Sequence, residues 1–246
     1  MRAKSITAGA LKTKPIQGPD DKADNTPPIN TYIPRAIQNG KSLVRFSGTD
    51  EYLTGPDTFD CGNGDYTVSL WWYQNGNSSV QGPHIGKWKS VQNYHIILSM
   101  FVVNSSMITI TSLSEVSNSI KENFSAISSN ALVCNAWNHI TLVNDRSSGH
   151  TYYINGNAAT ITVPITNTST TDDINIDSPL EIGRSRGAGS IYTYTSDGNK
   201  IADFRNYAYA FSSDDVSDLY NDSLTQGKYV GDYGSSTNLQ QRLKNS

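Results

Sequence analysis

The sequence is poor in charge, and the charge that it carries is nearly balanced. Its 246 residues include 19 Lys and Arg, 22 Asp and Glu and 4 His, so only 17% are charged and the formal net charge is −3. Nucleic-acid binders draw much of their affinity from clustered Lys and Arg that neutralise phosphates. The composition therefore excludes an ordinary basic nucleic-acid-binding protein, and we expect no nucleic-acid partner.

Cysteines and long apolar runs are scarce as well. Cys61 and Cys134 form no Cys-x-x-Cys motif, which argues against a zinc site and against a disulfide framework. We expect two partly buried thiols, with a single bridge between them as the alternative. No run approaches the roughly 20 apolar residues of a membrane helix, and residues 1–18 lack the apolar core of a secretory signal. We therefore expect no membrane insertion and no signal peptide.

The chain is rich instead in small polar residues, with 31 Ser, 22 Thr and 23 Asn, and it carries 14 Tyr. Ser, Thr and Asn side chains compete with the helical hydrogen bonds of the backbone. Thr and Tyr fit the pleated, half-buried surface of a sheet. The composition therefore favours an all-β domain with many polar turns, and 36% hydrophobic residues are enough for one core.

Residues 1–41 are predicted to form an extended arm rather than a domain. They carry five prolines, few large apolar residues and no period of 2 or 3.6, and the first 14 residues hold four basic side chains and no acid. A segment with so little apolar surface does not order itself. We expect the arm to be a solvated tail or to lie against a neighbouring chain. Residues 223–246 are predicted to form a C-terminal tail of the same kind.

From residue 42 onward, apolar and polar residues alternate as they do in half-buried strands. In residues 66–73, Val68, Leu70 and Trp72 share one face, which we expect to belong to the core. Further segments with strand patterns are 94–101, 107–113, 138–143, 151–154, 158–163, 180–182 and 201–207.

Two local signals stand out in the second half of the chain. Asn155-Gly156 suits the positive φ angles of a type I′ turn, which would join 151–154 to 158–163 as a hairpin. Residues 212–220 combine a hydroxyl cap, acids in the first turn and an apolar side, which predicts about two turns of helix. The fold class that we expect is an antiparallel β-sandwich of jelly-roll type over residues 42–222, with one short C-terminal helix.

Seven short motifs follow one another in a recognisable order. They are Ser42-Leu-Val-Arg-Phe-Ser-Gly-Thr-Asp-Glu-Tyr52, Tyr66-Thr-Val-Ser-Leu-Trp71, Ile85-Gly-Lys-Trp88, Trp137-Asn-His-Ile-Thr-Leu-Val143, Tyr153-Ile-Asn-Gly156, Leu180-Glu-Ile-Gly183 and Ile201-Ala-Asp-Phe-Arg205. Residues 42–222 thereby resemble the concanavalin A-like lectin/glucanase superfamily, in its laminin-G-like jelly-roll branch. The resemblance implies the sandwich fold, but it implies no single activity, because this fold carries lectins, hydrolases and structural proteins alike.

The chain lacks the catalytic pattern of the hydrolases in that superfamily. Its retaining glucanases carry Glu-x-Asp-x-x-Glu, which places an acid and a nucleophile on one strand. The four glutamates of this chain belong to no such motif, and its four histidines show neither metal-ligand nor triad spacing. We therefore expect no enzymatic activity, with a glycoside hydrolase as a remote alternative.

Calcium is the cofactor that the resemblance implies, since many related sandwiches hold it through carboxylates and loop carbonyls. Asp50 and Asp203 match positions at which family members carry acids, whereas Ser47 replaces the acid that is common before the first glycine. The alternative is that both acids accept hydrogen bonds from turn amides.

Sugar binding would use exposed aromatic rings, assisted by polar side chains around them. The candidate platform residues are Trp71, Tyr73, Trp88, Tyr192 and Tyr194. For each of them, burial against a second sheet or a neighbouring subunit is the alternative.

Two functions follow from these observations. The first is a non-enzymatic structural protein of a phage or virus particle, such as a capsid decoration or fibre-associated subunit. It would be made in the host cytoplasm, displayed on the virion and anchored to other capsid proteins through residues 1–41. The second is a lectin-like adhesion module that binds cell-surface glycans, and the two are compatible. We expect a homo-oligomer in either case.

Overall fold

The structure is a computed structural model that describes residues 43–46, 51–76, 80–104, 107–117, 119–128, 132–133, 135–169, 172–186 and 192–225. The arm at 1–41, Asp50, Cys134 and the tail from 226 lie outside the described residues.

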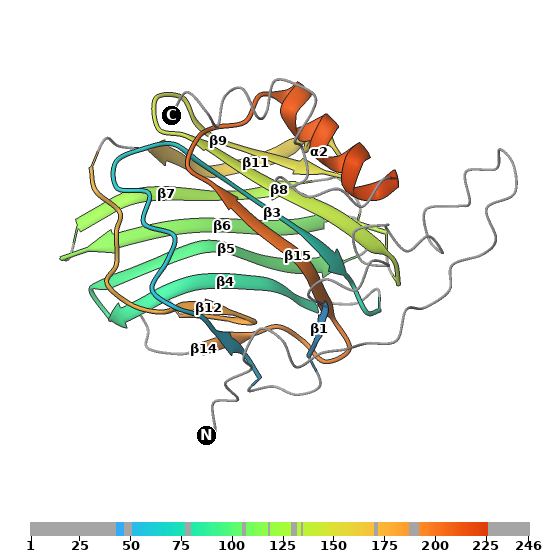
Figure 1. Ribbon diagram of the computed structural model, residues 1–246, viewed down its shortest axis with the longest axis horizontal. Coiled ribbons are helices and arrows are strands. Elements are labelled where there is room, and N and C mark those ends of the chain that lie inside the picture. Colours follow the sequence, from blue (N-terminus) through green and yellow to red (C-terminus); the bar gives the residue numbers. More distant parts are fainter. Residues whose placement is uncertain are drawn as a thin grey trace, which may run out of the picture.

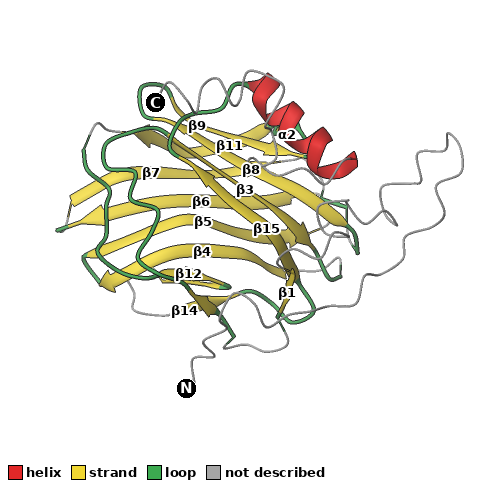
Figure 2. Cartoon of the chain, viewed as in Figure 1, coloured by secondary structure: helices red, strands yellow, loops and turns green. Residues whose placement is uncertain are grey.

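Two antiparallel sheets lie face to face in two layers (Figures 1 and 2). The six-stranded sheet has the order β1-β15-β3-β8-β9-β10 and the seven-stranded sheet the order β11-β7-β6-β5-β4-β12-β2, while β13 and β14 form a separate ribbon. These sheets confirm the predicted antiparallel sandwich. In the six-stranded sheet the bounds are β1 (Leu43–Arg45), β15 (Lys200–Tyr207), β3 (Tyr66–Tyr73), β8 (Trp137–Asp145), β9 (Gly149–Ile154) and β10 (Asn157–Ala158).

The remaining strands complete the second layer and the ribbon. They are β11 (Ile161–Ser169), β7 (Ser119–Ser128), β6 (Met107–Val116), β5 (Asn93–Asn104), β4 (Val80–Ser90), β12 (Leu180–Ile182), β2 (Leu53–Thr54), β13 (Arg184–Arg186) and β14 (Tyr192–Tyr194). One helix, α2 (Ser213–Thr225), is present among the described residues, and no helix there is long and apolar enough to cross a membrane.

The main core lies between the two sheets. The alternation in β3 is confirmed, because Val68, Leu70 and Trp72 are all at most 1% exposed and belong to this core. Ile140 and Leu142 on the neighbouring β8 are equally buried. Apolar burial of this extent is the main favourable contribution to folding.

The opposite face of β3 is buried too, because α2 covers it. Trp71 is 1% exposed and lies against Tyr220 of the helix, with 5.8 Å between ring centroids. Its indole N–H donates to the Ser223 hydroxyl at 3.2 Å. The helix therefore covers the outer face of β3 around Trp71, at the end of the sheet where Figure 2 shows it.

The start of α2 follows from its sequence. The Ser212 hydroxyl accepts from the Asp215 N–H, and the Asp215 carboxylate accepts from the Ser212 N–H, which together form a capping box. Phe211 and Val216 on either side of the cap share one apolar cluster. The helix is longer than predicted and ends at Thr225 rather than Tyr220, since the anchored Ser223 lies in its last turns.

The predicted hairpin is present but shorter than expected. Asn155 and Gly156 have φ angles of 50° and 78°, as a type I′ turn requires. After Ala158 the chain leaves this sheet, and β11 pairs with β7 of the other sheet. The single strand predicted for 158–163 is therefore wrong, because the chain changes layers inside it.

Two buried histidines make the stability of this fold depend on pH. Burial lowers the pKa of His84 to about 3, and burial together with the charge of Arg205 lowers that of His139 to about 3, against an ordinary value of 6.5. The unfolded chain therefore takes up protons first as the pH falls. The two histidines should leave the free energy of unfolding unaffected above about pH 6.5. Below that pH they should lower it, by up to about 1.4 kcal/mol per pH unit for each histidine.

The measurement is urea unfolding between pH 7.5 and pH 5, above the range in which most carboxylates titrate. H139Q should flatten the pH dependence whatever its effect on absolute stability. Equal slopes for the wild type and H139Q would contradict the assignment.

Candidate functional site

Four side chains form a row across the seven-stranded sheet. Trp88 of β4 pairs with Tyr94 of β5, Tyr94 with Glu115 of β6, and Glu115 with Ile120 of β7. Directly paired residues of antiparallel strands point to the same face of a sheet. We call this set the Trp88 row.

The Trp88 row lies on the outer face of its sheet. The adjacent pair on the same strands, Lys87 and His95, points the other way, because the His95 ring lies near the buried rings of Phe59 and Tyr66 at 5.7 Å and 6.0 Å. Alternation along each strand then directs the Trp88 row away from the core.

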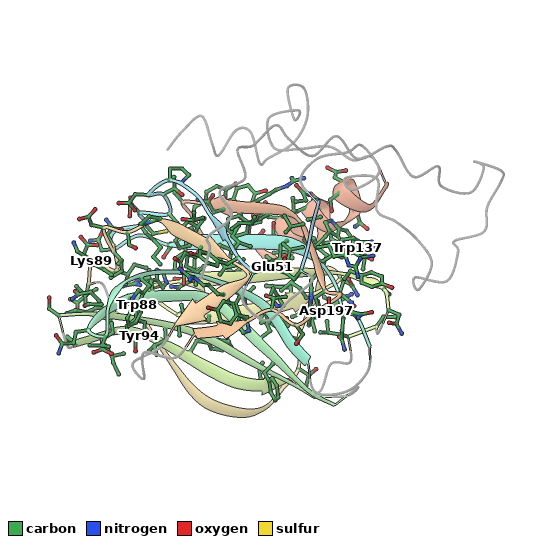
Figure 3. The ribbon with its side chains drawn as sticks, turned by 90° about the horizontal axis from the view of Figure 1, so that it is seen from below. Glu51, Trp88, Lys89, Tyr94, Trp137 and Asp197 are labelled. Carbon is green, nitrogen blue, oxygen red and sulfur yellow. The ribbon has the colours of Figure 1, made fainter. Side chains whose placement is uncertain are left out.

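Trp88 is the exposed member of a stacked aromatic pair. Its ring centroid is 5.7 Å from that of Tyr94 with 27° between the planes, and Tyr94 is 2% exposed whereas Trp88 is only partly buried. Of the two residues, Trp88 is therefore the more exposed. Figure 3 shows Trp88, Tyr94 and Lys89 together at one end of the sandwich.

A carboxylate adjoins the stack. The Tyr94 hydroxyl donates to Oε2 of Glu115 at 2.9 Å. Burial and this hydrogen bond raise the pKa of Tyr94 to about 12, so the tyrosine keeps its proton and remains a donor at neutral pH. Glu115 itself is only partly buried.

The rim of the row combines apolar and charged groups. Val91 and Ile120 are the exposed large apolar residues of the described part of the chain, at 40% and 56%. Lys89 pairs with Asp177 at 2.9 Å, and both are well exposed. The Ser178 hydroxyl donates to the Trp88 carbonyl and ties the strand to the neighbouring loop.

Lys87 fixes the strand from the inner side. Its fully buried ammonium donates to Asp57 at 2.5 Å and to Asp60 at 2.8 Å. The hydrogen bond from Lys87 is the main cause that lowers the pKa of Asp57. The loop that carries both acids also inserts Phe59 into the core with a positive φ of 69°. The strand that presents Trp88 is therefore held rigidly.

A second outward row crosses the six-stranded sheet. Arg45 of β1 pairs with Lys200 of β15, Lys200 with Tyr73 of β3, and Tyr73 with Trp137 of β8. The neighbouring positions Val44, Ile201 and Trp72 face the core, so this set faces outward. We call it the Lys200 row. In Figure 3, Trp137 lies at the end of the sandwich opposite Trp88.

The structure corrects the expected exposure of Trp71. This residue does point away from the core, as the alternation predicted, but α2 buries it to 1% exposure. A ring in this position has no face for a ligand, so Trp71 is not part of either surface.

The other predicted aromatic residues do not converge on one site. Trp88 and Tyr73 are partly exposed on different sheets, and Lys200 stands over the Tyr73 ring at 4.2 Å. Tyr194 is partly exposed on the β13–β14 ribbon. Tyr192 lies in the same ribbon, and its side chain is outside the described part of the structure.

Asp203 is engaged by a cation of the protein itself. Its two carboxylate oxygens accept from the Arg205 guanidinium at 2.8 Å and 2.7 Å, and both side chains are at most 10% exposed. A calcium ion needs six to eight oxygen ligands, so it would have to break this ion pair. Within the described residues no group of three His, Cys, Asp or Glu side chains is arranged to hold a metal. Calcium stays a prediction.

Sequence reasoning missed Tyr94 and Glu115 as partners of Trp88. The residues stand 21 positions apart, and only the register of β4, β5 and β6 brings all three together. Alternation of apolar residues could have placed Tyr94 and Glu115 on strands, but nothing in the sequence states which positions pair.

Comparison with known proteins agrees with this architecture. The family model of the concanavalin A-like lectin/glucanases superfamily matches residues 47–217. The chain belongs to this superfamily. No curated protein matches the sequence.

Several solved structures align with this chain at low sequence identity. The native heptameric SAP-like pentraxin from Limulus polyphemus aligns with a TM-score of 0.53 and 16% identity over 72% of this chain and 81% of its own. The receptor-binding domain of botulinum neurotoxin D aligns with a TM-score of 0.48 and 14% identity. The alignment covers 73% of this chain and 43% of the toxin domain, so this chain spans less than half of it. The CBM40 of Ruminococcus gnavus IT-sialidase, bound to α2,3-sialyllactose, aligns with a TM-score of 0.47 and 12% identity. The alignment covers 73% of this chain and 96% of the CBM40. At such identities the likeness concerns the fold alone.

Replacing Trp71 should affect stability strongly, whereas replacing Trp88 should not. W71A removes a ring that is buried under α2, together with the indole N–H that donates to the Ser223 hydroxyl, at a cost of about 3–5 kcal/mol. W88A removes a partly exposed ring and should cost about 1 kcal/mol. Urea unfolding of both variants measures the difference. Equal losses would contradict the burial of Trp71.

Proposed function

We propose that this sandwich is a carbohydrate-binding, lectin-like module and that the Trp88 row is its sugar platform. The observation that carries the proposal is the partly exposed indole of Trp88, stacked on buried Tyr94 and next to the Glu115 carboxylate. Sugar rings present C–H groups that pack on an aromatic face and hydroxyls that donate to carboxylates. The row offers both partners on one flat surface.

Rigidity supports this assignment. Stacking on Tyr94 and the anchoring of β4 through Lys87 fix the indole before a ligand arrives. A pre-organised platform loses little conformational entropy on binding. Membership in a superfamily that includes lectins is consistent with a binding role.

A binding role also suits the glutamates whose contacts are described. Glu115 accepts from Tyr94, and Glu181 forms an ion pair with Arg184. A glycosidase needs a proton-donating carboxyl group and a second carboxylate across the same sugar. Both of these carboxylates serve as hydrogen-bond acceptors within the fold.

The virion role stays a prediction. It depends on the arm at 1–41, which lies outside the described residues, and no comparison speaks for a capsid partner. A homo-oligomer is also a prediction, and it would be compatible with glycan binding, as many weak lectin sites gain avidity from repetition.

A glycan array followed by calorimetry tests the proposal. The wild type should bind at least one neutral glycan class. W88A should weaken that binding by about tenfold or more, because it removes the stacking face. W88F, which keeps an aromatic ring, should retain much of the affinity.

E115Q serves as a second probe, since it keeps the shape of Glu115 but removes its charge. It should reduce the affinity less than W88A does. A blank array, or glycan binding that W88A leaves unchanged, would overturn the assignment of Trp88.

A further inference from the structure

The Lys200 row holds two like charges side by side. Arg45 and Lys200 are directly paired on β1 and β15 and point outward from the same sheet. Like charges at directly opposed positions destabilise a sheet. Within the described residues, neither of the two forms an ion pair with a carboxylate. The fold therefore maintains a local positive charge in a chain whose net charge is −3.

The position of Lys200 makes this repulsion more costly. Its ammonium stands 4.2 Å from the centre of the Tyr73 ring, and the residue is partly buried. Burial lowers the pKa of Lys200, and the charge of Arg45 lowers it further. An anion between the two side chains would relieve both effects, because it would pair with each cation.

The surroundings of the two cations supply further polar side chains and one partly exposed ring. Tyr73 is partly exposed beside Lys200, and it meets Trp137, which is 7% exposed, edge to face with 5.6 Å between ring centroids. The exposed Asn75 and Asn135 adjoin this end of β3. The Asn135 side-chain oxygen accepts from the Gly76 N–H, and the Asn75 side-chain amide donates to the Asp197 carbonyl. Amide side chains of this kind pair with hydroxyl groups, so a saccharide would find polar partners beside the two cations.

We propose that the Lys200 row is a second binding site, specific for an acidic saccharide whose carboxylate or sulfate group lies between Arg45 and Lys200. Its occupant is thus a sugar unit with an anionic substituent, which the uncharged indole of the Trp88 row does not select. This inference rests on the proposed function in one respect, namely that the ligand is a saccharide. The two rows lie on different sheets, so their failures can be told apart.

Calorimetry with matched oligosaccharides tests the inference. The probes are a galacturonate oligomer, a sulfated galactose oligomer and the uncharged galactose oligomer. The wild type should bind at least one charged probe more tightly than the uncharged one. Raising NaCl from about 50 mM to about 300 mM should weaken that binding, because salt screens the contact. Which charged probe binds more tightly identifies the anionic group as carboxylate or sulfate.

Variants assign the binding to the row. R45Q should lower the affinity for the charged probe by about tenfold or more, as expected for one lost charge-assisted hydrogen bond. It should not lower the thermal midpoint of the free protein, since it removes a repulsion. K121Q changes the net charge equally at a distant pair with Asp172 and should leave the affinity for the charged probe unchanged.

Four outcomes would overturn the inference. One is equal affinity for charged and uncharged probes, and another is equal loss in R45Q and K121Q. The third is binding of free inorganic sulfate as tight as that of the sulfated oligomer, which would mean an anion site without a sugar contribution. Loss of charged-probe binding in R45Q but not in W88A would support two separate sites, whereas loss in W88A alone would refute the Lys200 row and leave the Trp88 row intact.

Discussion

Burial of β3 on both faces is the constraint on which the rest of the structure depends. Trp72 fills the core between the sheets, and Trp71, the next residue, is covered by α2. A strand with two buried faces must lie in the middle of its sheet, with its backbone groups paired on both sides. In this chain β15 and β8 provide that pairing, and each of them brings an outward residue next to Tyr73.

Much of this architecture could be predicted from the sequence, because alternation states which residues face the core. The faces of β3, the Asn155-Gly156 turn and the capped helix after Phe211 were all local patterns. β4 was missed, since Gly82, Pro83 and Gly86 interrupt its alternation and the strand carries bulges there. β7 was missed because its large apolar residues, Ile120, Phe124 and Ile127, do not follow a period of two.

The candidate surfaces could not be predicted in the same way. Trp88 was recognised as an aromatic candidate, but Glu115 became its neighbour only through the register of three strands. Trp71 was misjudged because alternation cannot reveal that a helix from the end of the chain covers the outer face. Strand register and the covering of a sheet face by a helix are tertiary properties. The alternation of apolar residues along one strand carries no information about either. The same limit hid Arg45 and Lys200, which no local motif connects.

The position of β15 has a consequence for the order in which the protein is made. This strand lies between β1 and β3, although it follows both by most of the chain length (Figure 1). During synthesis, one side of β3 therefore has no partner strand until nearly the whole domain has been made. Such non-local pairing slows folding. Until β15 is made, the nascent chain therefore exposes unpaired backbone groups of β3, and such an edge can associate with other strands.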